Sequence, residues 1–162
     1  AAPGDFFGQT LAAQDATVII GSLGSVANRA YAYRYDAALD AFALVDTLSS
    51  EPAVDAAEVS AFGTAVAIDG PLVVIVAIAV ASLQTAAFVY EEDAATGTYA
   101  QIDTLVPAAA ATDVFNLVSA AIAGDLIVLG APLASRPQDG VKSGAAFVFA
   151  RQSDASATAF IE

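Results

Sequence analysis

The chain has 162 residues, of which 57% are hydrophobic and 14% charged, and its formal net charge is −13. This charge argues against a nucleic-acid partner, because only five Lys and Arg residues are present to meet phosphates, and it fits a secreted or salt-tolerant surface. The absence of Cys and His excludes disulfides, His-based zinc sites and catalytic groups built on Cys or His within the chain, and no apolar run approaches the roughly 20 residues of a membrane span.

An internal repeat organises the sequence. Phe7, Phe62 and Phe115 recur at nearly equal intervals, and Tyr33 and Tyr90 each precede an Asp-Thr-Leu triplet by the same spacing. We therefore expect one continuous segment of three repeats, at about residues 5–60, 61–113 and 114–162.

Each repeat is predicted to contain four strands. In the first, a strand of small residues follows Phe7, and a turn at 14–16 leads to an apolar strand that reads VIIG. Next comes a strand in which Tyr31, Tyr33 and Tyr35 alternate, so that their rings share one face. We expect these rings in the core between repeats, with sugar stacking as the alternative. A last strand reads FALVDTL.

The second repeat holds an unbroken apolar run, LVVIVAIAVA, at residues 72–81. An Asp-Gly-Pro turn signal precedes it, and branched residues favour a strand. Alignment with the third repeat predicts a buried inner strand over Leu72–Ile75, sets residues 76–78 where the third repeat has Gly-Ala-Pro but without that turn signature, and predicts a loop beyond. The inner strands of all three repeats are expected to be buried on both faces, because they are continuously apolar.

The third repeat has a turn at 123–125, the strand LIVLG and a loop at 133–144. Arg136 and Lys142 in this loop make the only basic spot on an acidic chain, and Asp139 lies between them. Because binding residues favour loops on rigid scaffolds, these three residues form a candidate partner-contact loop.

Four antiparallel strands in a unit of about 54 residues are typical of a β-propeller blade. A solenoid of β-sheets and a single sandwich are the alternatives. The predicted fold class is therefore all-β, with three propeller blades. Because a propeller needs about four to eight blades, we expect the chain to be part of a larger propeller, or copies of it to complete one.

Several motifs resemble FG-GAP repeats, a family that includes the integrin α-subunit propeller and many secreted repeat proteins. They are Phe-Gly at 7–8 and 62–63, VAIDG at 66–70, LIVLGAP at 126–132 and SGAAFVF at 143–149. The resemblance covers essentially the whole chain, although Asn follows Phe115 where Gly is expected. The motif residues are Phe7, Gly8, Phe62, Gly63, Phe115, Gly130, Ala131 and Pro132.

The resemblance implies a propeller of about seven blades, usually extracellular, that serves adhesion or ligand binding. Some members hold calcium in a loop between the two central strands, where carboxylates supply the oxygen ligands. The corresponding loops at 22–30 and 78–86 have no carboxylate, and the loop at 133–144 has only Asp139. We therefore expect no cofactor and no metal.

Other polar residues have structural interpretations. Glu91, Glu92 and Asp93 could bind a cation or form an acid–base pair, but a solvated turn is favoured. Asp46 and Asp103 are expected to bond the local backbone at a strand end, with ligand contact as the alternative.

The leading function is a non-enzymatic propeller module for structural assembly, adhesion or protein or ligand binding on an extracellular or cell-surface structure. Its expected partners are other protein chains or further blades. The alternative is a propeller enzyme of lyase or glycosidase type, with carboxylate and Tyr chemistry in a central channel. The starts of the inner strands would line such a channel, and among them only Asp125 is ionisable, which weighs against catalysis.

Overall fold

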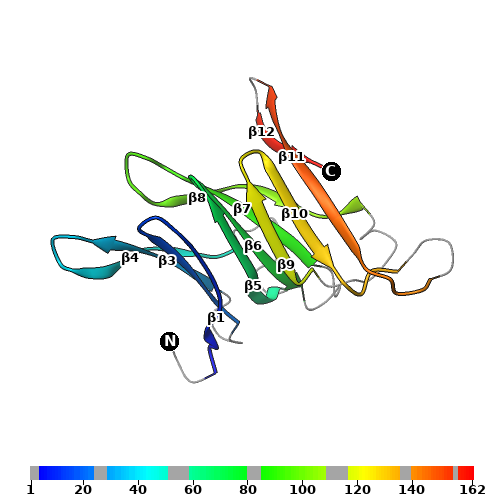
Figure 1. Ribbon diagram of the computed structural model, residues 1–162, viewed down its shortest axis with the longest axis horizontal. Helices are drawn as coiled ribbons and strands as arrows, with labels where there is room; N and C mark the ends of the chain where they lie inside the picture. The colour runs from blue at the N-terminus through cyan, green and yellow to red at the C-terminus, as the bar shows by residue number, and fades with distance from the viewer. Residues whose placement is uncertain are drawn as a thin grey trace.

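A computed structural model describes residues 4–23, 29–50, 59–79, 85–108, 117–135, 140–154 and 157–162. Within these ranges the regular structure is β-strand apart from a single 3-10 position at Ala108, which confirms the all-β prediction, and no helix is present there that could cross a bilayer. The strands form three four-stranded antiparallel sheets (Figure 1). In each sheet every strand pairs with the next along the chain.

We name the sheets A, B and C in chain order. Sheet A contains β1 (Phe7–Gln14), β2 (Thr17–Ser22), β3 (Arg29–Asp36) and β4 (Ala41–Leu48). Sheet B contains β5 (Val59–Asp69), β6 (Leu72–Ala79), β7 (Thr85–Glu92) and β8 (Tyr99–Leu105). Sheet C contains β9 (Ser119–Ala123), β10 (Leu126–Ala131), β11 (Ala145–Asp154) and β12 (Ala157–Ile161).

The first two strands of each sheet are joined by the tight turns that the sequence predicts. The first turn residue is Asp15, Gly70 or Gly124, with φ of 52°, 56° and 55°. Asp and Gly tolerate this left-handed conformation, which tight hairpin turns require. The three turns therefore have the same geometry at equivalent positions.

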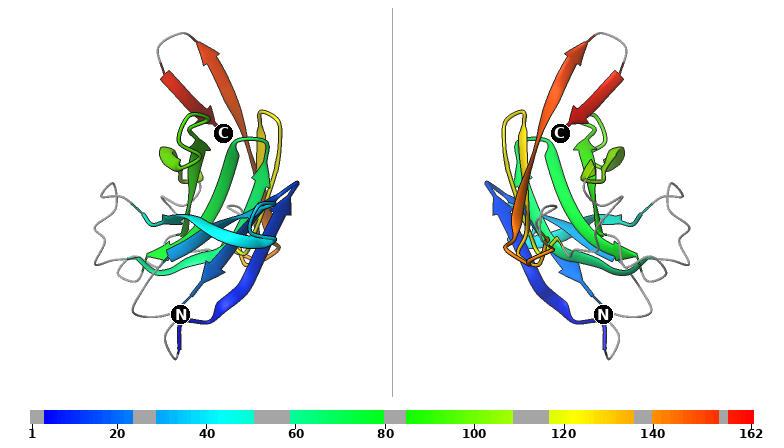
Figure 2. Two further views of the ribbon diagram at one scale, coloured as in Figure 1. Left: turned by 90° about the vertical axis from the view of Figure 1, so that its left-hand side faces the viewer. Right: turned by 90° about the vertical axis from the view of Figure 1, so that its right-hand side faces the viewer.

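Sheet B lies between sheets A and C (Figures 1 and 2). Strand β5 packs against β1 and β2 on one side and against β9 on the other, so the first strands of the three sheets are neighbours. The outermost strands β8 and β12 also contact each other. Each junction between sheets thus brings together strands at matching positions.

Each junction packs an aromatic face of one sheet against an aliphatic face of the preceding sheet. At the A–B junction, sheet A contributes Ile19, Ala30, Ala32 and Leu48, and sheet B contributes Phe62, Val73, Ile75, Phe88, Tyr90 and Tyr99. At the B–C junction, sheet B contributes residues that include Leu72, Val74, Val76, Ala87 and Val89, and sheet C contributes Ile127, Leu129, Phe147, Phe149 and Phe160. Strand alternation produces both faces, because successive side chains point to opposite sides of a sheet.

The Phe-Gly motifs form a bulge at the start of β1 and three residues into β5. Gly8 and Gly63 have φ of 90° and 94°, and the pairing register of both strands shifts just after the Phe. Glycine adopts positive φ without a Cβ clash, and a bulge redirects the strand. Sheet A must also approach closely here, since a Cβ on Gly21 would lie 2.6 Å from the carbonyl oxygen of Gly63.

Phe7 and Phe62 are equivalent in position but differ in burial. The ring of Phe62 is fully buried, with its centroid 5.6 Å from that of Phe88 and 6.5 Å from that of Tyr90. Phe7 contacts two tyrosines of β3 at the matching distances of 5.4 and 6.4 Å. It is nevertheless 42% exposed, because its side of sheet A has no neighbouring sheet among the described residues.

The apolar run at 72–81 corrects one prediction. Strand β6 continues to Ala79, so the end of the inner strand predicted at Ile75 is wrong. Val76 and Ala77 stay in the strand because they pair with β5 on one side and with β7 on the other, and both side chains are buried.

Burial of the inner strands on both faces holds only for sheet B. Residues 72–77 of β6 are all buried, as predicted. The same prediction is wrong for β10, where Leu126 is 50% exposed and Val128 is 38% exposed, and for β2, where Val18 and Ile20 are only half-buried. Sheet B alone has a neighbouring sheet on each face in the described part of the chain.

Candidate functional site

The predicted partner-contact loop is only partly described. Arg136 and Asp139 lie outside the described residues. Lys142 is exposed, and it forms an isolated β-bridge with Ser135. The base of the loop is closed by the amides of residues 143 and 144, which both donate to the carbonyl oxygen of Ala134. The structure therefore gives the loop a defined base, and of the three candidate residues it describes Lys142.

The Gly-Ala-Pro motif has a structural position. Gly130 and Ala131 end β10, and Pro132 follows in a turn. A Cβ on Gly130 would collide with the side chain of Ser119 on the paired strand β9, so glycine fits this close contact. Phe115, the remaining motif residue, lies outside the described residues.

One face of sheet A is open and aromatic, and we call it the aromatic face. A groove of about 370 Å³ on it is lined by Phe7, Val18, Ile20, Tyr33 and Phe42. Leu11, paired with Ile20, borders this groove and is 64% exposed. The rings of β3 share this face, as alternation predicts, but they are half-buried or exposed, whereas the sequence analysis placed them in a core. Exposed apolar surface of this kind is typical of interaction sites.

The opposite end of the stack carries a second open face, on sheet C. We call it the aliphatic face and define it by Leu126, Val128, Val148 and Ile161, which are 38% to 50% exposed. The next residues along β10 and β11, such as Ile127 and Phe149, point into the B–C junction and are buried. Both ends of the described stack therefore present apolar side chains.

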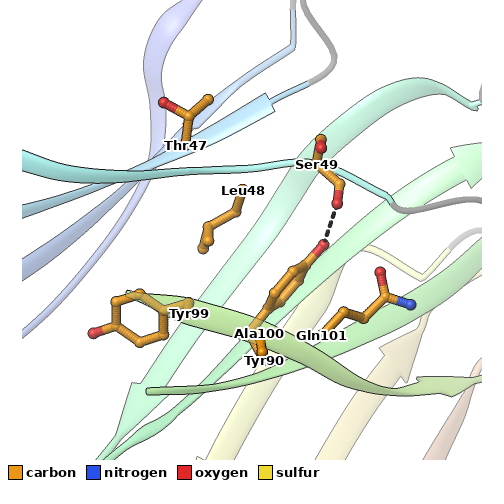
Figure 3. Close-up of a pocket in the computed structure, with 7 residues that line it drawn as sticks. All are labelled: Thr47, Leu48, Ser49, Tyr90, Tyr99, Ala100 and Gln101. Atoms are coloured by element: carbon orange, nitrogen blue, oxygen red, sulfur yellow. Dashed lines mark hydrogen bonds between the residues drawn. The ribbon is translucent and has the colours of Figure 1, made fainter. Parts of the chain in front are cut away.

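A pocket of about 340 Å³ lies at the outer end of the A–B junction (Figure 3). It is lined by Thr47, Leu48, Ser49, Tyr90, Tyr99, Ala100 and Gln101. The hydroxyl of Tyr90 donates a 2.8 Å hydrogen bond to the backbone carbonyl of Ser49 and so ties β7 to the end of β4 (Figure 3). No lining residue carries a charge, and the phenols of Tyr90 and Tyr99 are the titratable groups of the lining.

Tyr99 has a perturbed phenol. Burial raises its pKa above the ordinary value of 10.0, and the nearby carboxylate of Glu92 raises it further. Arg34 acts in the opposite direction and lowers it. The phenol therefore stays neutral at physiological pH and does not act as a base there.

The acidic cluster at the end of β7 is divided between two junctions. Glu92 pairs with Arg34 of sheet A at 2.8 Å, and Glu91 pairs with Arg151 of sheet C at 2.9 Å. The interpretation of these two residues as a solvated turn is wrong, because adjacent strand residues point to opposite faces and each carboxylate meets a different sheet. Asp93 does lie in a turn, and no group of three or more possible metal-ligating side chains occurs among the residues described.

Asp46 and Asp103 each join two sheets. One oxygen of each carboxylate accepts the amide of the following Thr at 2.7 Å, which confirms the predicted local bond. The other oxygen reaches the last strand of the next sheet, where Asp46 accepts from the amide of Tyr99 at 2.7 Å and Asp103 from that of Phe160 at 2.8 Å. The matching Asp-Thr-Leu triplets signalled equivalent positions, but only the structure reveals the second bond.

The tight turns make a further repeated contact, which the sequence analysis missed. The side-chain oxygen of Gln14 accepts from the amide of Gly70 at 2.6 Å, and that of Asp69 accepts from the amide of Gly124 at 2.6 Å. Each bond links a turn of one sheet to the equivalent turn of the next. The two junctions therefore share their apolar packing and two kinds of hydrogen bond.

No protein-family model matches the chain, and no curated protein is significantly similar to it.

Proposed function

We propose that the chain is an arc of a β-propeller that serves as a non-enzymatic module for assembly, adhesion or protein or ligand binding on an extracellular or cell-surface structure. The observation that carries this proposal is the repeated junction between sheets. Sheets A and B meet through the same strand positions, turn bonds and edge-strand bonds as sheets B and C. A junction that is repeated in this way is what successive propeller blades use.

The resemblance to FG-GAP repeats supports the same proposal. The two described Phe-Gly motifs have one geometry, and both place the Phe on the aromatic face of a sheet. The family resemblance adds the expectation of about seven blades and of an extracellular location, with which the net charge of −13 agrees.

Binding is a better match than catalysis to the chemistry of the described surface. The carboxylates nearest the junctions are occupied by structural contacts, since Glu91 and Glu92 pair with arginines and Asp46 and Asp103 accept two amides each. The open aromatic and aliphatic faces offer apolar area, which suits contact with protein. We therefore propose other protein chains or further blades as partners.

Distances between spin labels at Ala16, Pro71 and Asp125 test the arc. These exposed turn positions are equivalent, because each carbonyl accepts an amide from the third strand of its sheet at 2.8 to 2.9 Å. The chain has no Cys, so pairwise Cys substitutions place labels only there. For an arc of seven blades, the A-to-C distance should be about 1.8 times the A-to-B distance.

A distance ratio of 2 indicates a straight stack and overturns the propeller. The non-enzymatic assignment has its own test, in which the purified chain is incubated with neutral and acidic polysaccharides. We expect no turnover. A cleavage activity that disappears in the Glu92→Gln variant would contradict the assignment.

A further inference from the structure

The aromatic face of sheet A is one half of the junction that the chain already uses twice. Each residue that lines its groove has an equivalent residue on sheet B, and those sheet B residues are covered by sheet A. Phe7, Val18, Ile20, Tyr33 and Phe42 match Phe62, Val73, Ile75, Tyr90 and Tyr99. All five residues of the sheet B set are at most 9% exposed. The aromatic face therefore has the shape and chemistry of a surface that packs against a preceding sheet.

The aliphatic face of sheet C matches the apolar part of the other half of this junction, while Ala123 stands where Gln14 and Asp69 accept the turn amides, so the turn bond is not repeated there. Leu126, Val128 and Val148 match Leu72, Val74 and Val89 of sheet B. The sheet B residues are buried under the aromatic face of sheet C. The stack therefore ends in two open surfaces that are complementary in kind, one aromatic and one aliphatic.

We propose that a second copy of this chain occupies the aromatic face, with its aliphatic face packed there as sheet A packs on sheet B. This inference rests on the proposed function, and it names the partner. The contact is head-to-tail, because different surfaces meet, so it leads either to a closed ring or to a growing chain of copies.

Charge at the junctions does not oppose this pairing of sheets. Arg34 of sheet A, Glu91 of sheet B and Ala150 of sheet C are equivalent residues. In the proposed contact, Ala150 of one copy would face Tyr35 of the other copy, because Tyr35 is the sheet A equivalent of Glu92 and Arg151. A junction from sheet C to sheet A is therefore neutral at this point, whereas sheet C followed by sheet B would leave Glu92 opposite Ala150. Charge is therefore compatible with sheet A following sheet C.

The same neutrality sets the expected salt dependence. No ion pair forms at this point between copies, while each copy carries a net charge of −13. Added salt screens the repulsion between the two negatively charged copies, so the association should become tighter as salt is added. An interface held by ion pairs would instead weaken with salt.

Sedimentation velocity of the whole chain tests the proposal, with the variants Leu11→Lys and Val148→Lys. Leu11 is 64% exposed on the aromatic face and Val148 is 50% exposed on the aliphatic face, so both lysines are tolerated in the single chain. We expect the native chain to associate at micromolar concentration, and each variant to bind itself about tenfold or more weakly, because a lysine would be buried at position 148, as Val89 is, and half-buried at position 11, as Val66 is. Leu39→Lys, which changes a 67% exposed residue of the β3–β4 turn that belongs neither to the groove lining nor to the aliphatic face, is the matched control and should associate normally.

Mixing the two variants gives the decisive result. Leu11→Lys keeps a native aliphatic face and Val148→Lys keeps a native aromatic face, so an equimolar mixture should form a one-to-one dimer that neither variant forms alone. Absence of association in the native chain, or absence of a dimer in the mixture, overturns the inference. The label distances within one chain are independent of association, so they still decide whether the three sheets form an arc.

Discussion

The Phe62→Ala substitution tests whether a neighbouring sheet determines the contribution of each Phe-Gly motif. Phe62 is fully buried in the A–B junction and contacts Phe88 and Tyr90. Removing its ring costs the transfer free energy and leaves a cavity, so the free energy of unfolding should fall by about 3–5 kcal/mol.

The Phe7→Ala substitution is the matched control. It removes the same ring, with two aromatic neighbours at nearly the same distances, from a residue that is already 42% exposed. The transfer contribution shrinks to about 1–2 kcal/mol, and the open groove leaves no enclosed cavity. We therefore expect the loss to be smaller than that for Phe62→Ala by about 2 kcal/mol or more.

Urea denaturation, followed by circular dichroism at low protein concentration, measures both losses. Because stacked sheets can unfold in steps, hydrogen exchange of the amides of β1 and β5 should accompany it. Equal losses for Phe7→Ala and Phe62→Ala at low concentration would refute the reasoning, since coverage by the preceding sheet would then make no difference.

Three further predictions concern polar contacts between sheets. Asp103→Ala removes the 2.8 Å acceptor of the Phe160 amide, and it should cost about 1–3 kcal/mol; unchanged hydrogen-exchange protection of that amide would contradict this. Glu92→Arg sets like charges opposite Arg34 and should cost up to about 1 kcal/mol, which Arg34→Glu in the same chain should restore in urea midpoints. Tyr99 has a raised pKa in the folded state, so its phenol ionises first in the unfolded chain, and stability should fall as pH rises above about 10. Tyr99→Phe should reduce that fall, and identical urea midpoints against pH would contradict the prediction.

Local signals in the sequence were sufficient to predict that each repeat forms a four-stranded unit. Asp15, Gly70 and Gly124 mark turns because only a few residue types tolerate positive φ there. Alternating rings in β3 and β7 identify strands with two distinct faces. Both kinds of signal depend on residues close together in the chain, so they can be recognised without knowledge of how the sheets pack.

The contacts between sheets could not be predicted in the same way. Glu92 and Arg34 meet only because sheet B packs against sheet A, and the sequence alone favoured a solvated turn for Glu92. The exposure of Val128 in β10 has the same origin, since the apolar pattern of an inner strand does not reveal whether a neighbouring sheet is present. Strand β6 extends beyond its predicted end at Ile75 because its pairing with β5 continues to Ala79 and its pairing with β7 continues to Ile78.

The two ion pairs occupy equivalent positions at the two junctions, but the sheet that supplies the arginine is reversed between them. This reversal bears on the order of the sheets. The earlier sheet supplies Arg34 at the A–B junction and Glu91 at the B–C junction, while the later sheet supplies Glu92 and Arg151. If sheet C followed sheet A directly, Arg34 would face Arg151, and two copies of sheet B would set Glu91 against Glu92. Each pair contributes little to stability, because these side chains are partly exposed. Repulsion in the wrong orders adds a small preference for the native order to that of the apolar packing, in which sheet A has Gly21 where sheet B has Val76.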